Sequence, residues 1–224
     1  MVGGFKGFFA NQGTDPDFAT IAAWASRRGL AFKREREGQG FVVDGALDGR
    51  PWRLEWGPSQ RSYIDGQELR LRMELGLPPD LLMLLLTKPL MESLERQAYE
   101  EFTQGNQTQL GSATPEETRW LVLFPKISLA STPTLRGLFG GVSNVANEGQ
   151  WWLEGSLARA LEHAAGSTLR DAPPWLVMTL KGRAYLRMET ADVDEDTVAA
   201  VLDLFETACS EAIRVAAARG GPAR

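Results

Sequence analysis

The chain has very little cysteine or histidine, with one residue of each, Cys209 and His163, among 224 residues. A single cysteine excludes an internal disulfide framework and a thiolate metal cluster. A single histidine excludes a histidine-rich metal site, and a Ser-His-Asp or Cys-His mechanism would have to use His163. Helical spacing puts His163 on a polar face and Cys209 in an apolar stripe. We therefore predict no catalytic residue, no metal site and no cofactor.

Long apolar runs and an excess of positive charge are also missing. The longest purely apolar run, Leu81–Leu86, is far too short to cross a membrane. The first residues lack the charged segment and apolar stretch of a secretory signal. The formal net charge is −5, which disfavours general nucleic-acid binding. We expect a soluble, cytoplasmic protein that binds neither membranes nor nucleic acids.

The sequence does contain the apolar residues of a globular core and clear strand patterns. Hydrophobic residues make up 43% of the chain. Apolar and charged residues alternate through 52–56 and 69–75, and Asp48-Gly49 and Asp65-Gly66 are turn signals. A second hairpin is predicted at 175–180 and 184–189, turning at 181–183. Such alternation gives each strand one buried and one wet face, so the sheet should be antiparallel.

Helical spacing of apolar residues predicts a helix at 150–165 and a last helix at 195–218. Leu81–Leu86 follows two prolines and reads as the start of a helix that is apolar on every side. We predict a buried strand at Trp120–Phe124 and a glycine-rich loop from Arg136 to Gly149. The predicted fold class is α+β, with an antiparallel sheet covered by helices on one face.

A short repeat suggests a duplicated helix–sheet–helix unit. Leu71-Arg-Met-Glu74 recurs as Leu186-Arg-Met-Glu189, each on the second strand of a predicted hairpin. A four-residue match alone proves little, and the shared order of elements is the better argument. We divide the chain into a first α+β half at 1–102, a polar connector at 103–114 and a second half at 115–224, and leave open whether they form one continuous domain.

An acidic stretch at Asp192–Asp196 has two interpretations. The spacing of its carboxylates resembles the start of a calcium loop, but Thr197 stands where such a loop needs glycine. Acidic residues also stabilise the N-terminus of a helix. We interpret the stretch as the start of the last helix, with Asp194 as its cap.

The outward face of the predicted hairpins is rich in arginine and also carries glutamate and tyrosine. It is either a solvated face with cross-strand ion pairs or a groove that binds an anionic ligand or an acidic protein segment. If it binds, we predict that the glycine-rich segment closes over the face. The predicted ligand-binding residues are Arg70, Arg72, Arg187, Ser143, Asn144 and Asn147.

Three functions are compatible with these observations. The first is a non-catalytic ligand- or protein-binding module, or adaptor, that uses the polar sheet face. The second, compatible with the first, is a homo-oligomer or complex subunit that buries Leu81–Leu86 against a partner. The alternative is an enzyme with carboxylate-based or metal-assisted chemistry and an unknown substrate.

Overall fold

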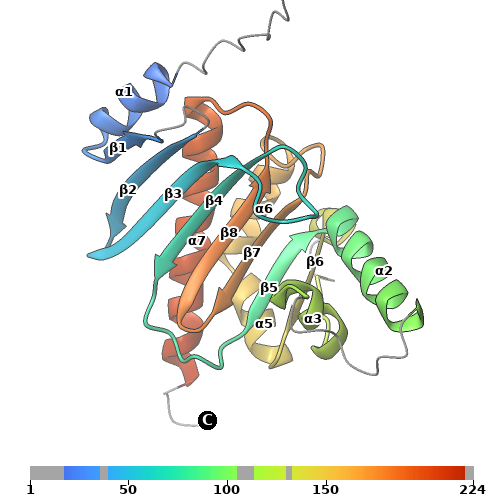
Figure 1. Cartoon of the computed structure of the whole chain (residues 1–224). Helices are drawn as coiled ribbons and strands as arrows, with labels where there is room; N and C mark the ends of the chain where they lie inside the picture. Colours follow the sequence, from blue (N-terminus) through green and yellow to red (C-terminus); the bar gives the residue numbers. More distant parts are fainter. Residues whose placement is uncertain (1–17, 36–39, 105–113, 130–132, 220–224) are drawn as a thin grey trace, which may run out of the picture.

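The protein is described by a computed structural model that covers residues 18–35, 40–104, 114–129 and 133–219 (Figure 1). Its strands are β1 (Ala31–Arg34), β2 (Phe41–Leu47), β3 (Arg50–Pro58), β4 (Gln67–Glu74), β5 (Met83–Thr87), β6 (Phe139–Ser143), β7 (Trp175–Leu180) and β8 (Arg183–Glu189). Its helices are α1 (Ala19–Arg27), α2 (Lys88–Gln104), α3 (Glu116–Leu123), α4 (Pro133–Leu138), α5 (Ala146–Leu153), α6 (Ser156–Ala165) and α7 (Glu195–Arg219).

The described strands form one eight-stranded sheet in the order β1-β2-β3-β4-β8-β7-β5-β6, and every neighbouring pair is antiparallel. The predicted turns at Asp48-Gly49 and at 181–183 are present, each as a two-residue hairpin turn. Asp48 and Gly49 have φ of 48° and 75°, and Lys181 and Gly182 have φ of 51° and 80°. Positive φ at both positions matches the right-handed twist of the strands, as in a type I′ turn. The predicted α+β class and antiparallel sheet are confirmed.

One face of the sheet is covered by helices along its length, as predicted. Alternate strand residues such as Leu54, Leu71 and Leu186 are fully buried beneath α1, α5, α6 and α7 in one large apolar cluster. The long helix α7 runs behind the centre of the sheet in Figure 1. It is also joined to α5, because the indole nitrogen of Trp152 donates a hydrogen bond to the carbonyl oxygen of Ala208 at 2.9 Å.

Among the described residues, helices cover the opposite face at one end, where α2 and α3 lie over β7, β5 and β6 (Figure 1). Leu84, Val142 and Leu176 there pack with Leu94 of α2 and Trp120 of α3 in a second apolar cluster. The rest of this face, over β1 to β4 and β8, carries mainly charged and polar side chains. The chain therefore builds a sheet with one covered face and one half-covered face.

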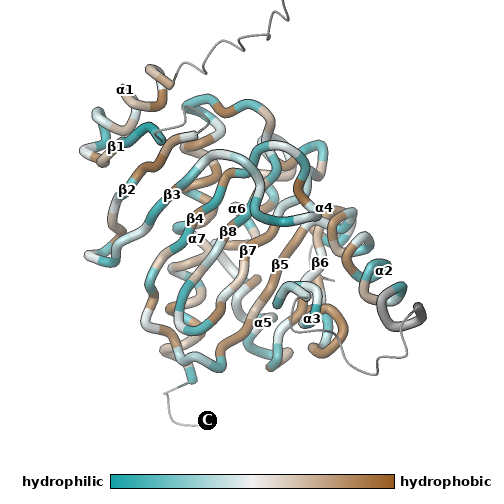
Figure 2. The backbone as a smooth tube through the Cα atoms, in the orientation of Figure 1, coloured by the Kyte–Doolittle hydropathy of each residue, from teal (hydrophilic) through white to brown (hydrophobic). Residues whose placement is uncertain are grey.

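The prediction of a helix at Leu81–Leu86 was wrong. Residues 83–86 belong to strand β5, which is apolar along its length in Figure 2. A strand with a helical layer on each face has no wet side, so its sequence reads as a continuous apolar run. Except for the half-buried Leu82, these side chains are fully buried within this one chain. The argument for a partner or homo-oligomer at Leu81–Leu86 therefore falls.

The prediction of a loop at Arg136–Gly149 was also wrong, because this segment holds the end of α4, strand β6 and the start of α5. Three of its glycines, Gly140, Gly141 and Gly149, are closely packed, whereas Gly137 has open space around it. A Cβ atom on Gly140 would lie 2.2 Å from the sulfur of Met91, and one on Gly149 would lie 2.6 Å from Ile127. The three packed glycines therefore reflect contact with α2 and with residue 127.

Two further elements differ from their predictions. Trp120–Phe124, predicted as a strand, is the end of helix α3 and its C-cap. The helix predicted at 150–165 is two helices, α5 and α6, separated at Gly155, whose φ of 77° ends the helical path. The hairpin at 175–189 and the last helix at 195–219 are confirmed.

The duplication is not confirmed. The two copies of the repeat lie on neighbouring strands, where Leu71 pairs with Leu186, but the strands around them differ. Residues 105–113 of the predicted connector lie outside the described residues, and the division at 103–114 stays a prediction. Within the described residues, no helix combines the length and apolarity that a membrane span requires.

Candidate functional site

The open part of the half-covered face brings together the three predicted arginines. Strand alternation buries leucines on one side of β3, β4 and β8 and turns charged residues to the other. The registers then align these outward residues in two rows. One row runs Glu55, Arg70, Arg187, and the next runs Arg53, Arg72, Tyr185.

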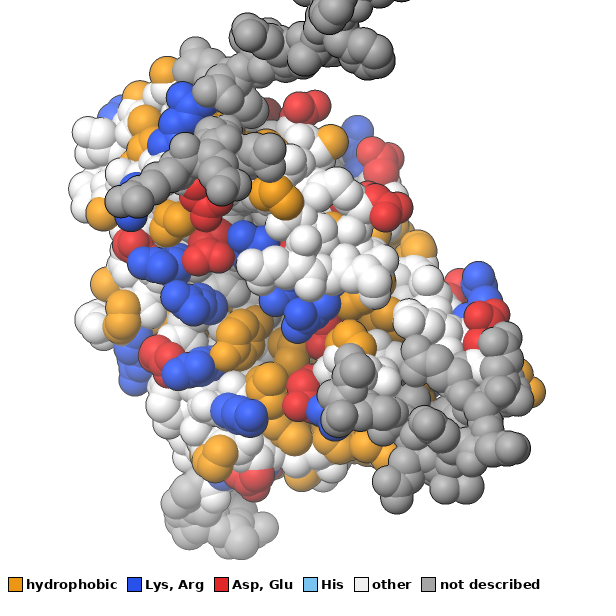
Figure 3. Space-filling view, viewed as in Figure 1, with side chains coloured by type: hydrophobic (Ala, Val, Ile, Leu, Met, Phe, Trp, Pro, Cys, Tyr) orange, Lys and Arg blue, Asp and Glu red, His pale blue; other side chains and the backbone are white. Residues whose placement is uncertain are grey.

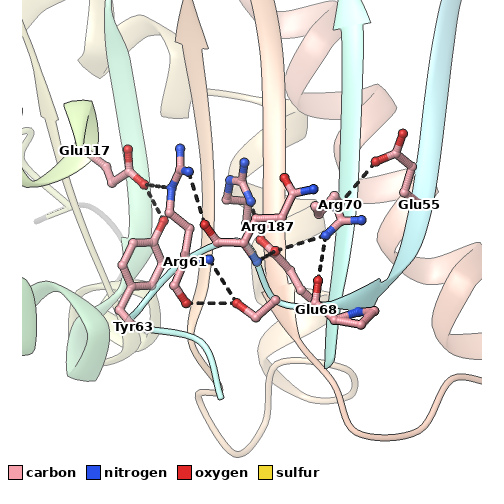
Figure 4. Close-up of polar contacts among 10 residues, drawn as sticks. Glu55, Arg61, Tyr63, Glu68, Arg70, Glu117 and Arg187 are labelled. Carbon is pink, nitrogen blue, oxygen red and sulfur yellow. Dashed lines mark hydrogen bonds and ion pairs between the residues drawn. The ribbon is translucent and has the colours of Figure 1, made fainter. Parts of the chain in front are cut away.

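Arg70 and Arg187 are held by a buried carboxylate (Figure 4). Glu68 is 0% exposed, and its oxygens lie 2.5 Å from Nη1 of Arg187 and 3.5 Å from Nη1 of Arg70. The backbone nitrogen of Gln60 donates a further hydrogen bond to Glu68 at 3.0 Å. Arg70 also lies 3.4 Å from Glu55. Because burying an unpaired carboxylate is costly, Glu68 fixes both guanidinium groups in place.

A second buried carboxylate joins this face to helix α3. Glu117 is 1% exposed, and its Oε1 accepts hydrogen bonds from Nε of Arg61 at 2.8 Å and from the hydroxyl of Tyr63 at 2.5 Å. Burial by itself raises the pKa of Glu117, but the Tyr63 hydrogen bond and the Arg61 charge together lower it. Burial, followed by the charge of Glu117, raises the pKa of Tyr63. The loop between β3 and β4 is thereby attached to α3 (Figure 4).

The remaining two arginines of the rows differ in their partners. Arg53 makes two hydrogen bonds to Asp44, at 2.7 and 3.1 Å, and lies 3.9 Å from Glu55. The side chain of Arg72 is exposed and makes no hydrogen bond or ion pair within the described part of the chain. Among the four arginines of the two rows, Arg72 is therefore the one that has no carboxylate partner within the described residues.

A small hollow of about 130 Å³ lies among these residues, lined by Arg53, Glu55, Gln60, Arg70, Leu71, Arg72, Tyr185, Leu186 and Arg187. A wider hollow of about 500 Å³ adjoins it over β1 to β3 and is lined by Lys33, Arg34, Glu35, Val42, Asp44, Arg53 and Glu55. Arg53 and Glu55 belong to both. Figure 3 shows basic and acidic side chains interspersed over these strands, at the left of the view.

The other predicted ligand-binding residues lie elsewhere. Ser143 is buried at the end of β6, and its hydroxyl donates to the carbonyl oxygen of Val145 at 2.9 Å. Asn144 accepts from the nitrogen of Leu82 at 3.2 Å and donates to the oxygen of Asp80 at 2.8 Å. Asn147 is exposed on α5. Because β7 and β5 separate β6 from β8, the structure does not bring these three residues to the arginines.

Sequence reasoning missed Glu68 and Lys33 as parts of this face. The signal for Glu68 was present, since it alternates with Arg70 and Arg72 and must share their side of β4. Nothing in the local sequence indicates that Glu117 of α3 meets the loop at Arg61 and Tyr63. That contact depends on how the strands are ordered.

The other residues considered for catalysis or metal binding are Cys209, His163 and Asp194. Cys209 is fully buried, and burial followed by the charge of Glu206 raises the pKa of its thiol. His163 is exposed at the rim of a hollow of about 280 Å³ between α6 and α7. Asp194 accepts a hydrogen bond from the nitrogen of Thr197 at 2.7 Å, which confirms it as the cap of α7. Among the described residues no three His, Cys, Asp or Glu side chains are grouped to hold a metal ion.

Comparison with known proteins gives no family. No family model matches the chain, and no curated protein matches it. A solved structure with some similarity is the mycobacterial trehalose monomycolate transport factor A, TtfA. It is 11% identical with a TM-score of 0.48, over 88% of this chain and 94% of that one.

Proposed function

We propose that this protein is a non-catalytic binding module that recognises an anionic group in the hollow between β3, β4 and β8. The observation that supports this most is the unbalanced charge of Arg72 in a hollow that three other arginines also line. Guanidinium groups bind carboxylates and phosphates through paired hydrogen bonds, so this position suits such a group.

The arrangement is prepared for binding before any ligand arrives. Glu68 fixes Arg70 and Arg187, and Asp44 fixes Arg53, so a ligand need not order these long side chains. Pre-organised donors lose less conformational entropy on binding than mobile ones do. Arg72 supplies the net attraction, and its neighbours supply fixed donors and the walls of the hollow.

Binding fits this face better than the alternative of carboxylate-based catalysis. The carboxylates of Asp44, Glu55 and Glu68 each lie within ion-pair distance of an arginine. A general acid or base must be free to contact a substrate, whereas these carboxylates already contact guanidinium groups. These carboxylates are therefore placed to position guanidinium groups.

The test is ligand-induced thermal stabilisation at low ionic strength, with phosphate, citrate and free glutamate as probes. We expect at least one probe to raise the melting temperature of the wild type, and added sodium chloride to reduce the shift because salt screens exposed charges. Arg72→Gln should abolish the shift. Arg183→Gln is the matched control, because Arg183 lies on the same face of β8 but is paired with Glu74.

Two results would overturn the proposal. One is a wild type whose melting temperature none of the three probes changes. The other is an Arg72→Gln variant that keeps the full shift. Arg70 is unsuitable for this test because its removal also disturbs the buried Glu68.

A further inference from the structure

The two hollows on the open face adjoin each other, because Arg53 and Glu55 line both, and together they are called the trough. The trough crosses β1, β2, β3, β4 and β8, which are consecutive in the sheet. With neighbouring strands about 4.8 Å apart, four steps span roughly 19 Å. An extended polypeptide advances about 3.3 Å per residue, so roughly six residues would fill this length.

Two cations of the trough have no ion-pair partner within the described residues. The side chain of Lys33 is exposed on β1 and, like that of Arg72, makes no hydrogen bond or ion pair within the part of the chain that is described. The carboxylate of Glu35, two residues after Lys33, is likewise unpaired among these residues. Lys33 lies in the row of Glu55 and Arg70, and Arg72 lies in the next row, three strands away. Three strand spacings and a two-residue offset put their Cα atoms roughly 16 Å apart.

Between these two cations the floor of the trough is mixed in sign. Asp44 is paired with Arg53, and Glu55 lies near both Arg53 and Arg70. The side chain of Asp44 is 46% exposed and that of Glu55 is 26% exposed, so a ligand would meet carboxylates as well as guanidinium groups. The occupant must therefore offer hydrogen-bond donors in its middle and negative charge near its ends.

We propose that the occupant is an extended acidic segment of another polypeptide, which lies across the strands with one carboxylate on Arg72 and a second on Lys33. This rests on the proposed function of the Arg72 hollow. Two acidic residues four positions apart in an extended chain point to the same side and are about 13 Å apart, a separation that the long side chains of Lys33 and Arg72 can span. The backbone N–H groups between them are donors for Asp44 and Glu55.

Other anions fit this trough less well. A small anion fills the hollow at Arg72 and leaves Lys33 without a partner. A nucleic acid carries a phosphate on every nucleotide, so some of its charges would lie over the exposed carboxylates of Asp44 and Glu55. The chain's net charge of −5 adds to that repulsion.

The test compares labelled heptapeptides by fluorescence anisotropy at low ionic strength. The first has glutamate at positions 1 and 5 with serine and threonine elsewhere, and the second has its two glutamates adjacent at positions 1 and 2. We expect the wild type to bind the first at least fivefold more tightly. Lys33→Gln should remove that preference, and Arg72→Gln should weaken both peptides at least tenfold. Arg183→Gln should change neither, and thermal unfolding checks that every variant is folded.

The failures of the two proposals are distinguishable. If Arg72→Gln abolishes stabilisation by free glutamate but Lys33→Gln leaves the peptide preference unchanged, the extended occupant is wrong and the anion site stands. If neither variant alters any binding, both proposals fall. A six-nucleotide single strand that binds more tightly than the first peptide, and loses affinity in both variants, would overturn the polypeptide assignment.

Discussion

The half-covered sheet face has a half covered by α2 and α3 and an open half, and the two are stabilised in different ways. One row of paired residues crosses both halves: Asp44, Arg53, Arg72, Tyr185, Met178, Leu84 and Val142. Under α2 and α3 the row is apolar and buried, and beyond Tyr185 it is charged. The change takes a single strand step, from Tyr185 on β8 to Met178 on β7. Burial stabilises the covered half, whereas ion pairs organise the open half.

Tyrosines mark the boundary between the halves. Tyr63 and Tyr185 both pack against the apolar cluster beneath α2 and α3 while their polar ends belong to the open half. An aromatic ring with a hydroxyl suits a position with one dry and one wet side. The covering helices, and not the strands, therefore decide where charge is tolerated on this face.

The largest loss of stability should come from a substitution in the covered half. Leu84→Ala removes a fully buried side chain and leaves a cavity beneath α2 and α3. We expect it to lower the free energy of unfolding by about 2–5 kcal/mol, measured by urea denaturation. Val42→Ala, on the same face in the open half, should cost less than half as much. Equal losses would mean that the two halves do not differ in how they are stabilised.

The next effect tests the buried carboxylate of the open half. Glu68→Gln leaves Arg70 and Arg187 adjacent without the charge that balances them. We expect a loss of about 2–3 kcal/mol, less than for a fully buried pair because both arginines reach water. Glu74→Gln on the same strand and face should cost less than about 1 kcal/mol, since its pair with Arg183 is exposed. Similar losses for the two variants would contradict the special role of Glu68.

A smaller effect, dependent on pH, should come from the link between the halves. The folded pKa of Glu117 lies below its ordinary value of about 4.3, so its ionised form stabilises the fold above that pH. This contribution is lost as the pH falls through the folded pKa. Glu117→Gln should cost about 1–2 kcal/mol at pH 7, and the difference from wild type should shrink below about pH 4. Chemical denaturation at a series of pH values measures this.

The neighbouring residue provides the control for that experiment. Glu116 is more exposed and pairs with Arg119 one helical turn away, so Glu116→Gln should cost less than about 0.5 kcal/mol at pH 7. A loss in Glu117→Gln that stays constant from pH 7 to pH 3 would show that the carboxylate charge is not what attaches the loop to α3.

The smallest effect should come from Arg72. Because it has no partner within the described residues, Arg72→Gln should change the free energy of unfolding by less than about 0.5 kcal/mol. Arg70→Gln, one position along the same face, should cost about 1–2 kcal/mol because Glu68 loses a partner. Thermal and urea unfolding of the pair measure the contrast. A substantial loss in Arg72→Gln would identify it as a structural residue and weaken the binding proposal.

The parts of the fold that could be predicted from the sequence are those in which local pattern and tertiary environment agree. Strands β3, β4 and β8 alternate because one side is buried and the other meets water, and their turns carry Asp-Gly and Lys-Gly. The prediction for strand β5 was wrong because helices cover both of its faces, so its sequence does not alternate between apolar and polar residues. The prediction of a loop at the glycines of β6 was wrong because the local sequence cannot distinguish a glycine needed for backbone freedom from one needed for close packing against α2.

For the site, the sequence predicts on which side of its strand each residue lies, but not which strands are neighbours. Arg70, Arg72 and Arg187 were grouped correctly because alternation alone places them on one side of their strands. Ser143 and Asn144 were grouped with them wrongly, since the distance from β6 to β8 is set by strand order, which hydrophobic periodicity does not encode. The partners Glu68–Arg187 and Arg61–Glu117 depend on the same long-range order.

The strand order also determines when the sheet can be completed during folding. Strand β8 inserts between β4 and β7, so the Glu68–Arg187 pair joins residues 119 positions apart. Until the last hairpin docks, β4 and β5 both present unpaired backbone groups to solvent. Closing such long loops before their contacts form is entropically costly, and high contact order is associated with slow folding. On a ribosome, the centre of this sheet would stay open until nearly all of the chain described here had emerged.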